Sequence, residues 1–352
     1  MQFLRSYYIE LILMGILLAA VIFFAYLGYG LLSPQLAIQE FSGDEAFAHV
    51  ESQVAAGPRT TGSEAGRATV DWFTEELRRE GWRVVIQPYG VTVPAIGVTG
   101  PVTDTAETPA EMTALAATFS LSDMVALEAR NLIAIREPAT IDEDGTPPVA
   151  LVVAPYDSRI IADVDQSPGP SPGANVGASG AAVLLELART LNVDLSEHRV
   201  CLVFLDGEAN RGVPGWQPPY GGDLFLAEVA DEDEDLAECA DPRLAVVLEA
   251  VGGQNHRLQI DPASDAALSN ALWRTAAGSE FADQFVSGTG QPMPGAHNTF
   301  IDAGIPTVTL IEQGYPYRYT SEDTLDKVDA NSLMGVGYTL QLWLESGAPA
   351  LE

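Results

Sequence analysis

The sequence is short of basic residues, and above all of lysine. Only 17 of its 352 residues are lysine or arginine, against 49 aspartates and glutamates, so the formal net charge is −32. Lys327 is the single lysine. Because binding to nucleic acid depends on basic side chains that neutralise phosphates, this balance excludes nucleic acid as a partner.

Cysteine and histidine are also scarce. The two cysteines, Cys201 and Cys239, are too few for a disulfide scaffold or a cysteine-rich zinc site. They leave a single bridge open, and Cys201 lies in an apolar run that predicts a buried strand residue and not a reactive thiol. The four histidines are His49, His198, His256 and His297.

One long hydrophobic run stands near the N-terminus. Residues 11–32 carry no charge, and as a helix with a rise of about 1.5 Å per residue they would extend roughly 33 Å, enough to cross a bilayer. A cleavable signal peptide would have a shorter apolar region ending in small residues, and a buried core helix would show a polar face. The run therefore predicts an uncleaved transmembrane anchor.

The charges that flank this run predict its orientation. Arg5 precedes it and acidic residues such as Glu40 and Asp44 follow it, so the positive-inside rule places the N-terminus in the cytoplasm. We therefore expect a single-pass protein of the cell membrane. Its predicted parts are a cytoplasmic tail at 1–10, the anchor at 11–32, a tether at 33–42 and one extracytoplasmic domain at 43–352.

The extracytoplasmic part alternates amphipathic segments with unbroken apolar runs. Apolar residues at helical spacing predict helices over 43–57, 67–80 and 178–191, and Ser63 and Gly81 are the expected caps of the second helix. Strands are expected at Trp82–Gln87, Asn131–Ile135, Val149–Ala154, Val200–Asp206 and Leu244–Glu249. Strands that are apolar on both faces belong to sheets covered on both sides, so the predicted class is α/β, with a doubly wound, mostly parallel sheet flanked by helices.

Two stretches fit neither the helical nor the strand period. Residues 88–129 are rich in threonine, alanine, proline and glycine, and we expect a surface excursion between two strands there. The acidic run at 231–238 lacks the pattern of a calcium-binding loop and is expected to be a solvated loop.

Polar segments follow several of the predicted strands, at the edge where open α/β sheets bind their ligands. These segments are 155–158 (PYDS), 172–180 (PGANVGASG), 206–208 (DGE), Glu249 with the glycines after it, 296–300 (AHNTF) and 315–329 (YPYRYTSEDTLDKVD).

Together with residues 57–63 (GPRTTGS), these motifs resemble, in order and spacing, those of the co-catalytic zinc aminopeptidases and glutaminyl cyclases of clan MH. The resemblance covers nearly the whole extracytoplasmic part. It implies a doubly wound α/β fold and two zinc ions held by five side chains, with a glutamate that takes a proton from zinc-bound water. Glu208 stands at that general-base position, and Asp157 stands where relatives orient a zinc-binding histidine.

The zinc-ligand positions that the resemblance implies are altered in this chain. They fall on Pro155, Val176, Ala209, Glu249 and Tyr319. Only Glu249 is a good ligand, because proline, valine and alanine carry no side-chain donor and a tyrosine oxygen is a poor substitute for imidazole. His297 does not replace the lost ligands, since in relatives this position lies beside the site without binding zinc. We therefore predict no cofactor, and zinc only if the chain is an active enzyme.

The surviving acidic residues predict a cleft with excess negative charge. Asp157, Glu208 and Glu249 would converge where relatives hold two dications. We therefore expect the cleft to be neutralised by one of the arginines that flank the altered motifs, Arg159, Arg211 or Arg318.

Four further residues complete the expected cleft. His297 and Tyr319 belong to it through the resemblance. Trp216 and Tyr220 lie in a proline- and glycine-rich loop after Glu208, and they could line the pocket or pack on their own domain.

The sequence favours a membrane-anchored, metallopeptidase-like protein that is catalytically inactive and binds a peptide or protein partner. Glu208 is then either a relic of the family or a base in a changed mechanism. Two alternatives stay open. The first is an active zinc-dependent aminopeptidase, an exopeptidase, with an unusual metal site. The second is an interaction domain that binds through its acidic exterior or through residues 88–129.

Overall fold

The computed structural model describes residues 14, 17, 18, 39–94, 124–139, 145–231 and 234–348. The chain divides into two units, residues 1–39 and residues 40–352. Most of the expected anchor at 11–32 lies outside the described residues, and Met14, Leu17 and Leu18 within it are helical and exposed. Among the residues described, no helix has the length and hydropathy needed to cross a membrane. The anchor thus stays a prediction from the sequence.

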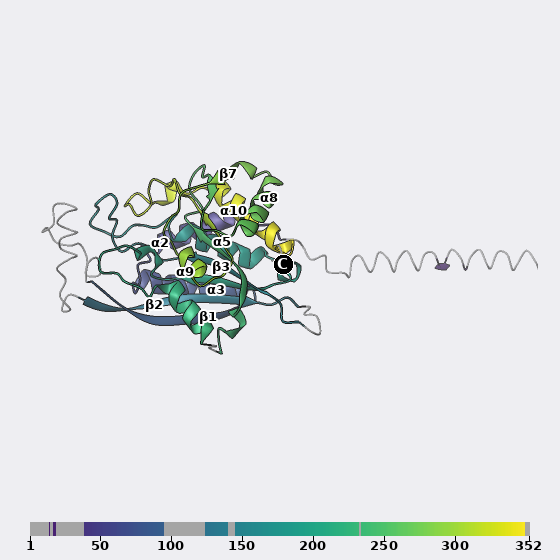
Figure 1. Ribbon diagram of the computed structural model, residues 1–352, viewed down its shortest axis with the longest axis horizontal. Helices are drawn as coiled ribbons and strands as arrows, with labels where there is room; N and C mark the ends of the chain where they lie inside the picture. Colours follow the sequence, from purple (N-terminus) through teal and green to yellow (C-terminus); the bar gives the residue numbers. More distant parts are fainter. Residues whose placement is uncertain are drawn as a thin grey trace, which may run out of the picture. The chain divides into compact units, whose positions relative to one another are not determined.

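A six-stranded sheet forms the centre of the second unit (Figure 1). Its strands, in spatial order, are β1 (Arg83–Pro94), β2 (Met124–Arg136), β4 (Arg199–Leu205), β3 (Val149–Pro155), β5 (Pro242–Glu249) and β8 (Thr307–Ile311). The four strands from β4 to β8 run parallel, whereas β2 pairs antiparallel with both β1 and β4. The predicted α/β class is confirmed, and the sheet is mixed because β1 and β2 form a hairpin at one edge.

Helices and short 3₁₀ turns connect and cover these strands. The α-helices are α2 (Gly43–Ala55), α3 (Glu64–Arg79), α5 (Ala178–Thr190), α6 (Val193–Ser196), α7 (Gly221–Ala230), α8 (Ala266–Ala277), α9 (His297–Asp302) and α10 (Ala330–Glu345). The 3₁₀ turns are η2 (Glu208–Asn210), η3 (Ala237–Cys239), η4 (Ala282–Gln284) and η5 (Leu325–Lys327). Two short strands, β6 (Leu258–Ile260) and β7 (Phe285–Thr289), pair parallel in a separate ribbon.

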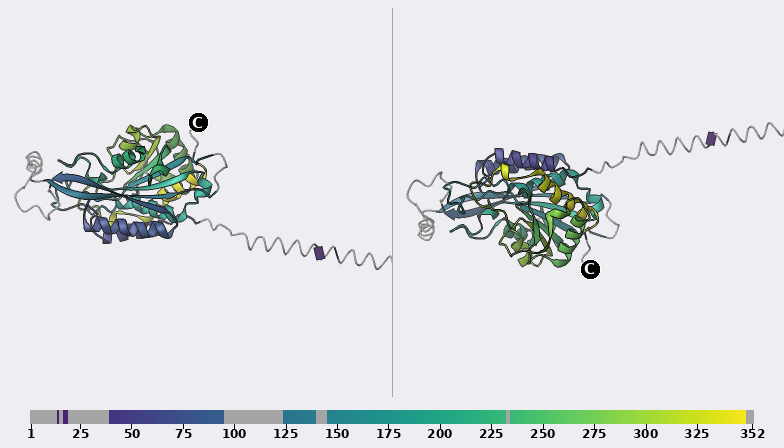
Figure 2. Two further views of the ribbon diagram at one scale, coloured as in Figure 1. Left: turned by 90° about the horizontal axis from the view of Figure 1, so that it is seen from below. Right: turned by 90° about the horizontal axis from the view of Figure 1, so that it is seen from above.

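Alternating side chains of the parallel strands face two separate cores. Leu202 and Phe204 of β4 belong to a core with residues of α2, α3, α5, α8 and α10. Val203 and Leu205 of the same strand belong to a second core, with Phe225 of α7 and Phe300 of α9. Figure 2 shows the early helices, in purple, against one face of the sheet. Both faces are therefore covered, which explains why these strands are apolar throughout.

Capping residues define the ends of the first two helices of this unit. The side chain of Ser42 accepts a hydrogen bond from the Glu45 amide at the start of α2, and Ser63 accepts one from Gly66 at the start of α3. Gly81, just after α3, has a φ of +82°, the left-handed conformation typical of glycine beyond a helix end. The expected helices and caps are confirmed here.

The edge hairpin extends into the stretch expected as a surface excursion. Residues 88–94 continue β1 and residues 124–129 belong to β2, with Pro88 opposite Arg130 in the ladder. A proline is tolerated here because β1 is an edge strand. The excursion predicted at 88–129 therefore begins after Pro94, and residues 95–123 lie outside the described part.

A disulfide joins Cys201 of β4 to Cys239 of η3. Both cysteines are fully buried, and Cys201 packs among the apolar residues of its strand, as predicted. The bridge closes 38 residues of sequence. It ties the segment after α7 and the acidic run to the sheet, and Glu238 of that run forms an ion pair with Arg83.

Candidate functional site

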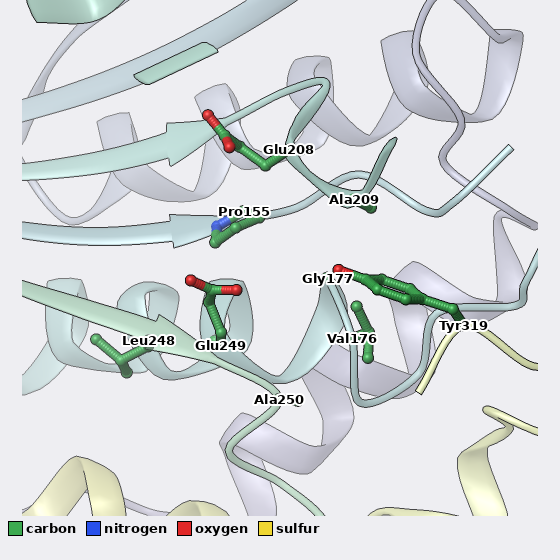
Figure 3. A pocket seen from close by; sticks show the side chains of 10 residues that line it. Pro155, Val176, Gly177, Glu208, Ala209, Leu248, Glu249, Ala250 and Tyr319 are labelled. Atoms are coloured by element: carbon green, nitrogen blue, oxygen red, sulfur yellow. The ribbon is translucent and has the colours of Figure 1, made fainter. Parts of the chain in front are cut away.

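The altered motifs meet in one pocket at the carboxyl ends of three neighbouring strands (Figure 3). Pro155 ends β3, Glu208 follows β4 and Glu249 ends β5. The lining residues are Pro155, Val176, Gly177, Gly180, Glu208, Ala209, Leu248, Glu249, Ala250 and Tyr319. They include the five residues that the sequence resemblance assigned to zinc-ligand positions, together with Glu208. The structure thus assembles the predicted site from segments far apart in the sequence.

The space inside this pocket is small. It has a volume of about 10 Å³ for the centre of a water-sized sphere, which is about the room that one water molecule needs. Alanine, valine, proline and leucine side chains supply much of the wall, and the Tyr319 side chain reaches across it (Figure 3). The pocket therefore has room for about one water molecule and none for a substrate side chain.

Arg211 neutralises the residue at the general-base position. Its Nε lies 2.5 Å from Oε2 of Glu208, and the other carboxylate oxygen accepts a hydrogen bond of 2.8 Å from the Gly222 amide. Arg211 also donates to the Thr299 hydroxyl at 2.9 Å, and its guanidinium lies 4.0 Å from the centre of the Tyr220 ring. Of the three arginines that the sequence proposed, Arg211 is the one that pairs with a carboxylate of the pocket.

Burial and pairing act in opposite directions on Glu208. Its side chain is 2% exposed, and burial raises its pKa overall, although the charge and hydrogen bonds of Arg211 and the Gly222 amide oppose this rise. Both carboxylate oxygens of Glu208 are thus held by donors of the protein itself, Oε2 by Arg211 and Oε1 by the Gly222 amide.

Glu249 forms a second buried pair, with His297 at the start of α9. The His297 Nδ1 lies 3.1 Å from Oε1 of Glu249, and the histidine is fully buried. Burial alone would lower the pKa of His297, but the hydrogen bond and charge of Glu249 raise it overall. Burial would raise the pKa of Glu249, and His297 together with two arginines lowers it overall. The pair is therefore an ion pair at mildly acidic pH.

Asp157 holds the backbone of η2 in place. Its carboxylate accepts hydrogen bonds from the Ala209 amide at 3.2 and 3.0 Å and lies 3.5 Å from the Asn210 side-chain amide. Burial and the nearby charge of Asp206 raise the pKa of Asp157 well above its usual value. The resemblance implied that Asp157 would orient a histidine; Pro155 stands at that histidine position and has no side-chain N–H to orient.

Tyr319 occupies the last ligand position and points its hydroxyl into the pocket (Figure 3). Arg159 lies 4.2 Å from the centre of the Tyr319 ring and Arg318 lies 5.8 Å from it. Arg159 does not pair with a carboxylate of the pocket. It forms an ion pair of 2.6 Å with Asp163 and donates a hydrogen bond of 2.7 Å to the Ala209 carbonyl. The expectation that one of these three arginines neutralises a carboxylate of the cleft is met by Arg211, while Arg159 and Arg318 lie beside Tyr319.

The aromatic candidates of the following loop lie outside the pocket lining. Trp216 is 3% exposed and packs in a small cluster with Val93, Ile160 and Val213. Tyr220 packs against that cluster, and the guanidinium of Arg211 lies over its ring. Of the two expectations for these residues, packing on their own domain is the one observed, because the outer end of the β1–β2 hairpin covers Trp216.

Unusual backbone conformations border the pocket. Tyr319 and Ala250 have φ values of +60° and +51°, in the left-handed region that costs free energy for residues other than glycine. Gly177 has a φ of +97°, and a side chain there would overlap the carbonyl oxygen of Asp157. Strain of this kind gathers at functional sites, and here both strained residues line the pocket.

The donors at this pocket do not fit a two-zinc centre. Among the described residues, no group of three or more histidine, cysteine, aspartate or glutamate side chains is arranged to hold a metal ion. The two carboxylates that line the pocket, Glu208 and Glu249, are each engaged by a cationic side chain or histidine. Zinc sites need at least three protein donors, so the residues present do not match the metal that the fold implies.

Two features of this site were not predicted from the sequence. The sequence left open which arginine enters the pocket, although Glu208 and Arg211 have the three-residue spacing that brings side chains together on one turn. It also gave no sign of the buried cluster beside Asp157, in which Asp206 accepts hydrogen bonds from Thr61, Tyr156 and the Arg130 amide.

The sequence profile described as Peptidase family M28 matches residues 131–343 of the chain. No curated protein sequence matches the chain.

Solved structures with the same fold include a leucine aminopeptidase precursor from Bacteroides thetaiotaomicron VPI-5482, at 23% identity and a TM-score of 0.67 over 88% of this chain and 98% of that one. A Zn-dependent exopeptidase from Parabacteroides distasonis ATCC 8503 is similar at 23% identity and 0.67, over 88% and 99%. The Tannerella forsythia glutaminyl cyclase is similar at 24% identity and 0.67, over 87% and 99%. At these identities the likeness shows the fold.

Proposed function

The chain belongs to peptidase family M28, and we propose that it is a membrane-anchored, extracytoplasmic member that binds a peptide or protein segment without hydrolysing it. The observation that carries this proposal is the ion pair of 2.5 Å between Arg211 and Glu208. The guanidinium of Arg211 binds the carboxylate that would have to be free to act as the base in hydrolysis.

Hydrolysis in a two-metal site needs an activated water and a base that accepts its proton. Four of the five ligand positions carry proline, valine, alanine or tyrosine, so the water would lack its metal. Glu208 is held by Arg211 and by the Gly222 amide, so the water would lack its base as well. Both losses point in the same direction, toward binding without turnover.

Two features support a location outside the cytoplasm. The hydrophobic run at 11–32 has the length of a membrane anchor, with the larger unit after it. The disulfide between Cys201 and Cys239 belongs to an oxidising compartment, because reducing systems keep most cytoplasmic cysteines as thiols. An anchored domain facing outward is consistent with both.

Zinc content and peptidase activity of the purified full-length chain test this proposal together. We expect less than about one zinc per ten chains after dialysis against zinc, because the protein donors number fewer than three, and no cleavage of aminoacyl reporters. Near-stoichiometric zinc with chelator-sensitive cleavage would overturn the proposal in favour of an active zinc aminopeptidase with an unusual site.

A restored variant provides the matched control for these assays. It carries Pro155→His, Val176→Asp, Ala209→Glu and Tyr319→His, with Arg211→Ala to release Glu208. We expect this variant to bind zinc, because it regains the five donors at the pocket. If the restored chain folds and still takes up no zinc, the mapping of the ligand positions is wrong.

The second alternative is binding through the acidic exterior or residues 88–129, and a deletion tests the part of it that concerns residues 88–129. Removing residues 95–123 leaves the pocket residues untouched. Loss of a captured partner on this deletion, with retention by variants of the pocket, would favour that alternative.

A further inference from the structure

Arg318 is the one of the three arginines around the pocket that the protein leaves without a carboxylate. Arg211 pairs with Glu208 and Arg159 pairs with Asp163. Among the residues that the structure describes, no acidic oxygen lies within ion-pair distance of Arg318. In a chain with a net charge of −32, an unpaired guanidinium in a half-buried position is unexpected.

Arg318 forms a hydrogen bond with the Tyr319 side chain, but its other hydrogen bonds are incomplete. Its Nε is buried and has no acceptor among the described residues. Its Nη2 reaches the Glu312 carbonyl only at 3.5 Å, near the limit of a hydrogen bond. A half-buried guanidinium that lacks acceptors costs free energy, which a bound anion would recover.

Arg318 lies at the edge of the pocket. Its charge acts on Tyr319 and Glu249, which both line the pocket, and its guanidinium lies 5.8 Å from the centre of the Tyr319 ring. The two carboxylates that line the pocket each have a partner, because Glu208 pairs with Arg211 and Glu249 hydrogen-bonds with His297.

One further carboxyl group stands nearby. Glu312 is packed against Gly253 and lies 3.4 Å from the Asn175 side-chain amide. Burial raises the pKa of Glu312 to about 7, so at neutral pH it balances only part of the charge of Arg318.

We propose that Arg318, beside Tyr319 at the edge of the closed pocket, binds a carboxylate group of a peptide ligand. This inference rests on the proposed binding function and names the chemistry of its ligand. A carboxylate fits because it can accept two hydrogen bonds from one guanidinium at once. With room inside the pocket for about one water molecule, the ligand lies at the rim, on Tyr319, and does not enter.

Isothermal titration with matched small peptides tests this site. The probes are N-acetylphenylalanine and its uncharged amide, added to the full-length chain in the presence of a metal chelator. We expect the acid to bind about tenfold more tightly than the amide, as one charge-assisted contact provides. N-acetylaspartate α-amide, with its carboxylate on the side chain, tells whether a terminal or a side-chain carboxylate is preferred.

Variants of Arg318 make the test specific. We expect Arg318→Gln to bind the acid about tenfold more weakly, and Arg318→Lys to give an intermediate loss because it keeps the charge without the paired N–H groups. Arg274→Gln is the control, since Arg274 is exposed on α8 and its loss should leave binding unchanged. Arg318→Lys also serves if Arg318→Gln does not fold.

Two results would overturn the proposal: no preference of the wild-type chain for the acid, or equal affinity in the Arg318 variants. Neither depends on catalysis, because the chelator removes zinc from every titration. If the chain proves to hydrolyse peptides with zinc, the proposed function fails, while the comparison of Arg318 with Arg274 still decides whether the carboxylate site exists.

Discussion

The guanidinium of Arg211 and the carboxylate of Glu208 lie in direct contact, with 2.5 Å between Nε and Oε2. They stand three residues apart in the sequence, on the 3₁₀ turn η2 and the residue that follows it. The pair lies at the pocket where the carboxyl ends of β3, β4 and β5 meet.

Removal of Arg211 should destabilise the protein. Arg211→Ala leaves the carboxylate of Glu208 buried without its cation, and breaking such a pair costs about 3–5 kcal/mol. The free energy of unfolding in urea measures this loss. The double variant Glu208→Gln with Arg211→Ala should recover part of it, because no unpaired charge then remains. A loss in the single variant no larger than that of Arg274→Ala, at an exposed position, would show that the pair contributes nothing.

The pair of His297 with Glu249 should make stability depend on pH. The pKa of His297 is raised in the folded protein, so its contribution is complete below the pKa of the unfolded chain and is lost as pH rises through the higher folded value. The pKa of Glu249 is lowered, so its contribution is lost as pH falls through that lower value. We expect the difference in unfolding free energy between wild type and His297→Gln to be largest at mildly acidic pH.

His49 offers a control of opposite sign for this pH series. Burial lowers its pKa, so its contribution should be lost as pH falls. Wild type and His49→Gln should therefore differ more at pH 8 than at pH 5. If both histidine variants follow the same trend, the assignment of these two environments is wrong.

The disulfide should contribute measurably to stability. Closing a loop of 38 residues removes enough freedom from the unfolded chain to stabilise the fold by about 4 kcal/mol. We expect the Cys201→Ala, Cys239→Ala variant to lose about this amount in urea unfolding. Alkylation of the native chain, before and after reduction, checks the bond. Two thiols that react without reduction would show that the cysteines are not paired.

Gly177 should tolerate no side chain. A Cβ there would overlap the Asp157 carbonyl oxygen, and the φ of +97° is itself unfavourable for alanine. Gly57 has a similar φ of +95° with nothing within 4 Å of the added atom, so it separates the two effects. We expect Gly57→Ala to cost about 1–2 kcal/mol for the backbone alone, and Gly177→Ala to cost more. Equal losses in urea unfolding would mean that the loop moves to make room.

Much of the fold followed from local signals in the sequence. The caps at Ser63 and Gly81 and the apolar runs of β3, β4 and β5 depend on residues close together in the chain, and these were placed within one or two residues. The strand β8, at Thr307–Ile311, was not predicted. It is short, and its identity as a strand depends on pairing with β5, which a local pattern does not reveal.

The site was predictable in part for a related reason. The carboxyl ends of parallel strands share one edge of the sheet, so Pro155, Glu208 and Glu249 could be expected together. The burial of Trp216 could not, because it depends on the far end of the β1–β2 hairpin, which contributes Val93 to the same cluster. Nor could the number of cysteines decide whether Cys201 and Cys239 pair.

Arg211 and the Gly222 amide each hold one oxygen of Glu208, and this limits how a metal site could form in the pocket. Returning histidine to the Tyr319 position alone would add one donor to a pocket that holds only Glu249 as a suitable ligand, and a zinc site needs more than two. Releasing Glu208 alone would leave a buried charge unpaired. No single substitution therefore gives the three donors that a zinc site needs, and the one at Arg211 also costs stability. Under the proposed function, several substitutions would have to occur together before this pocket could bind zinc.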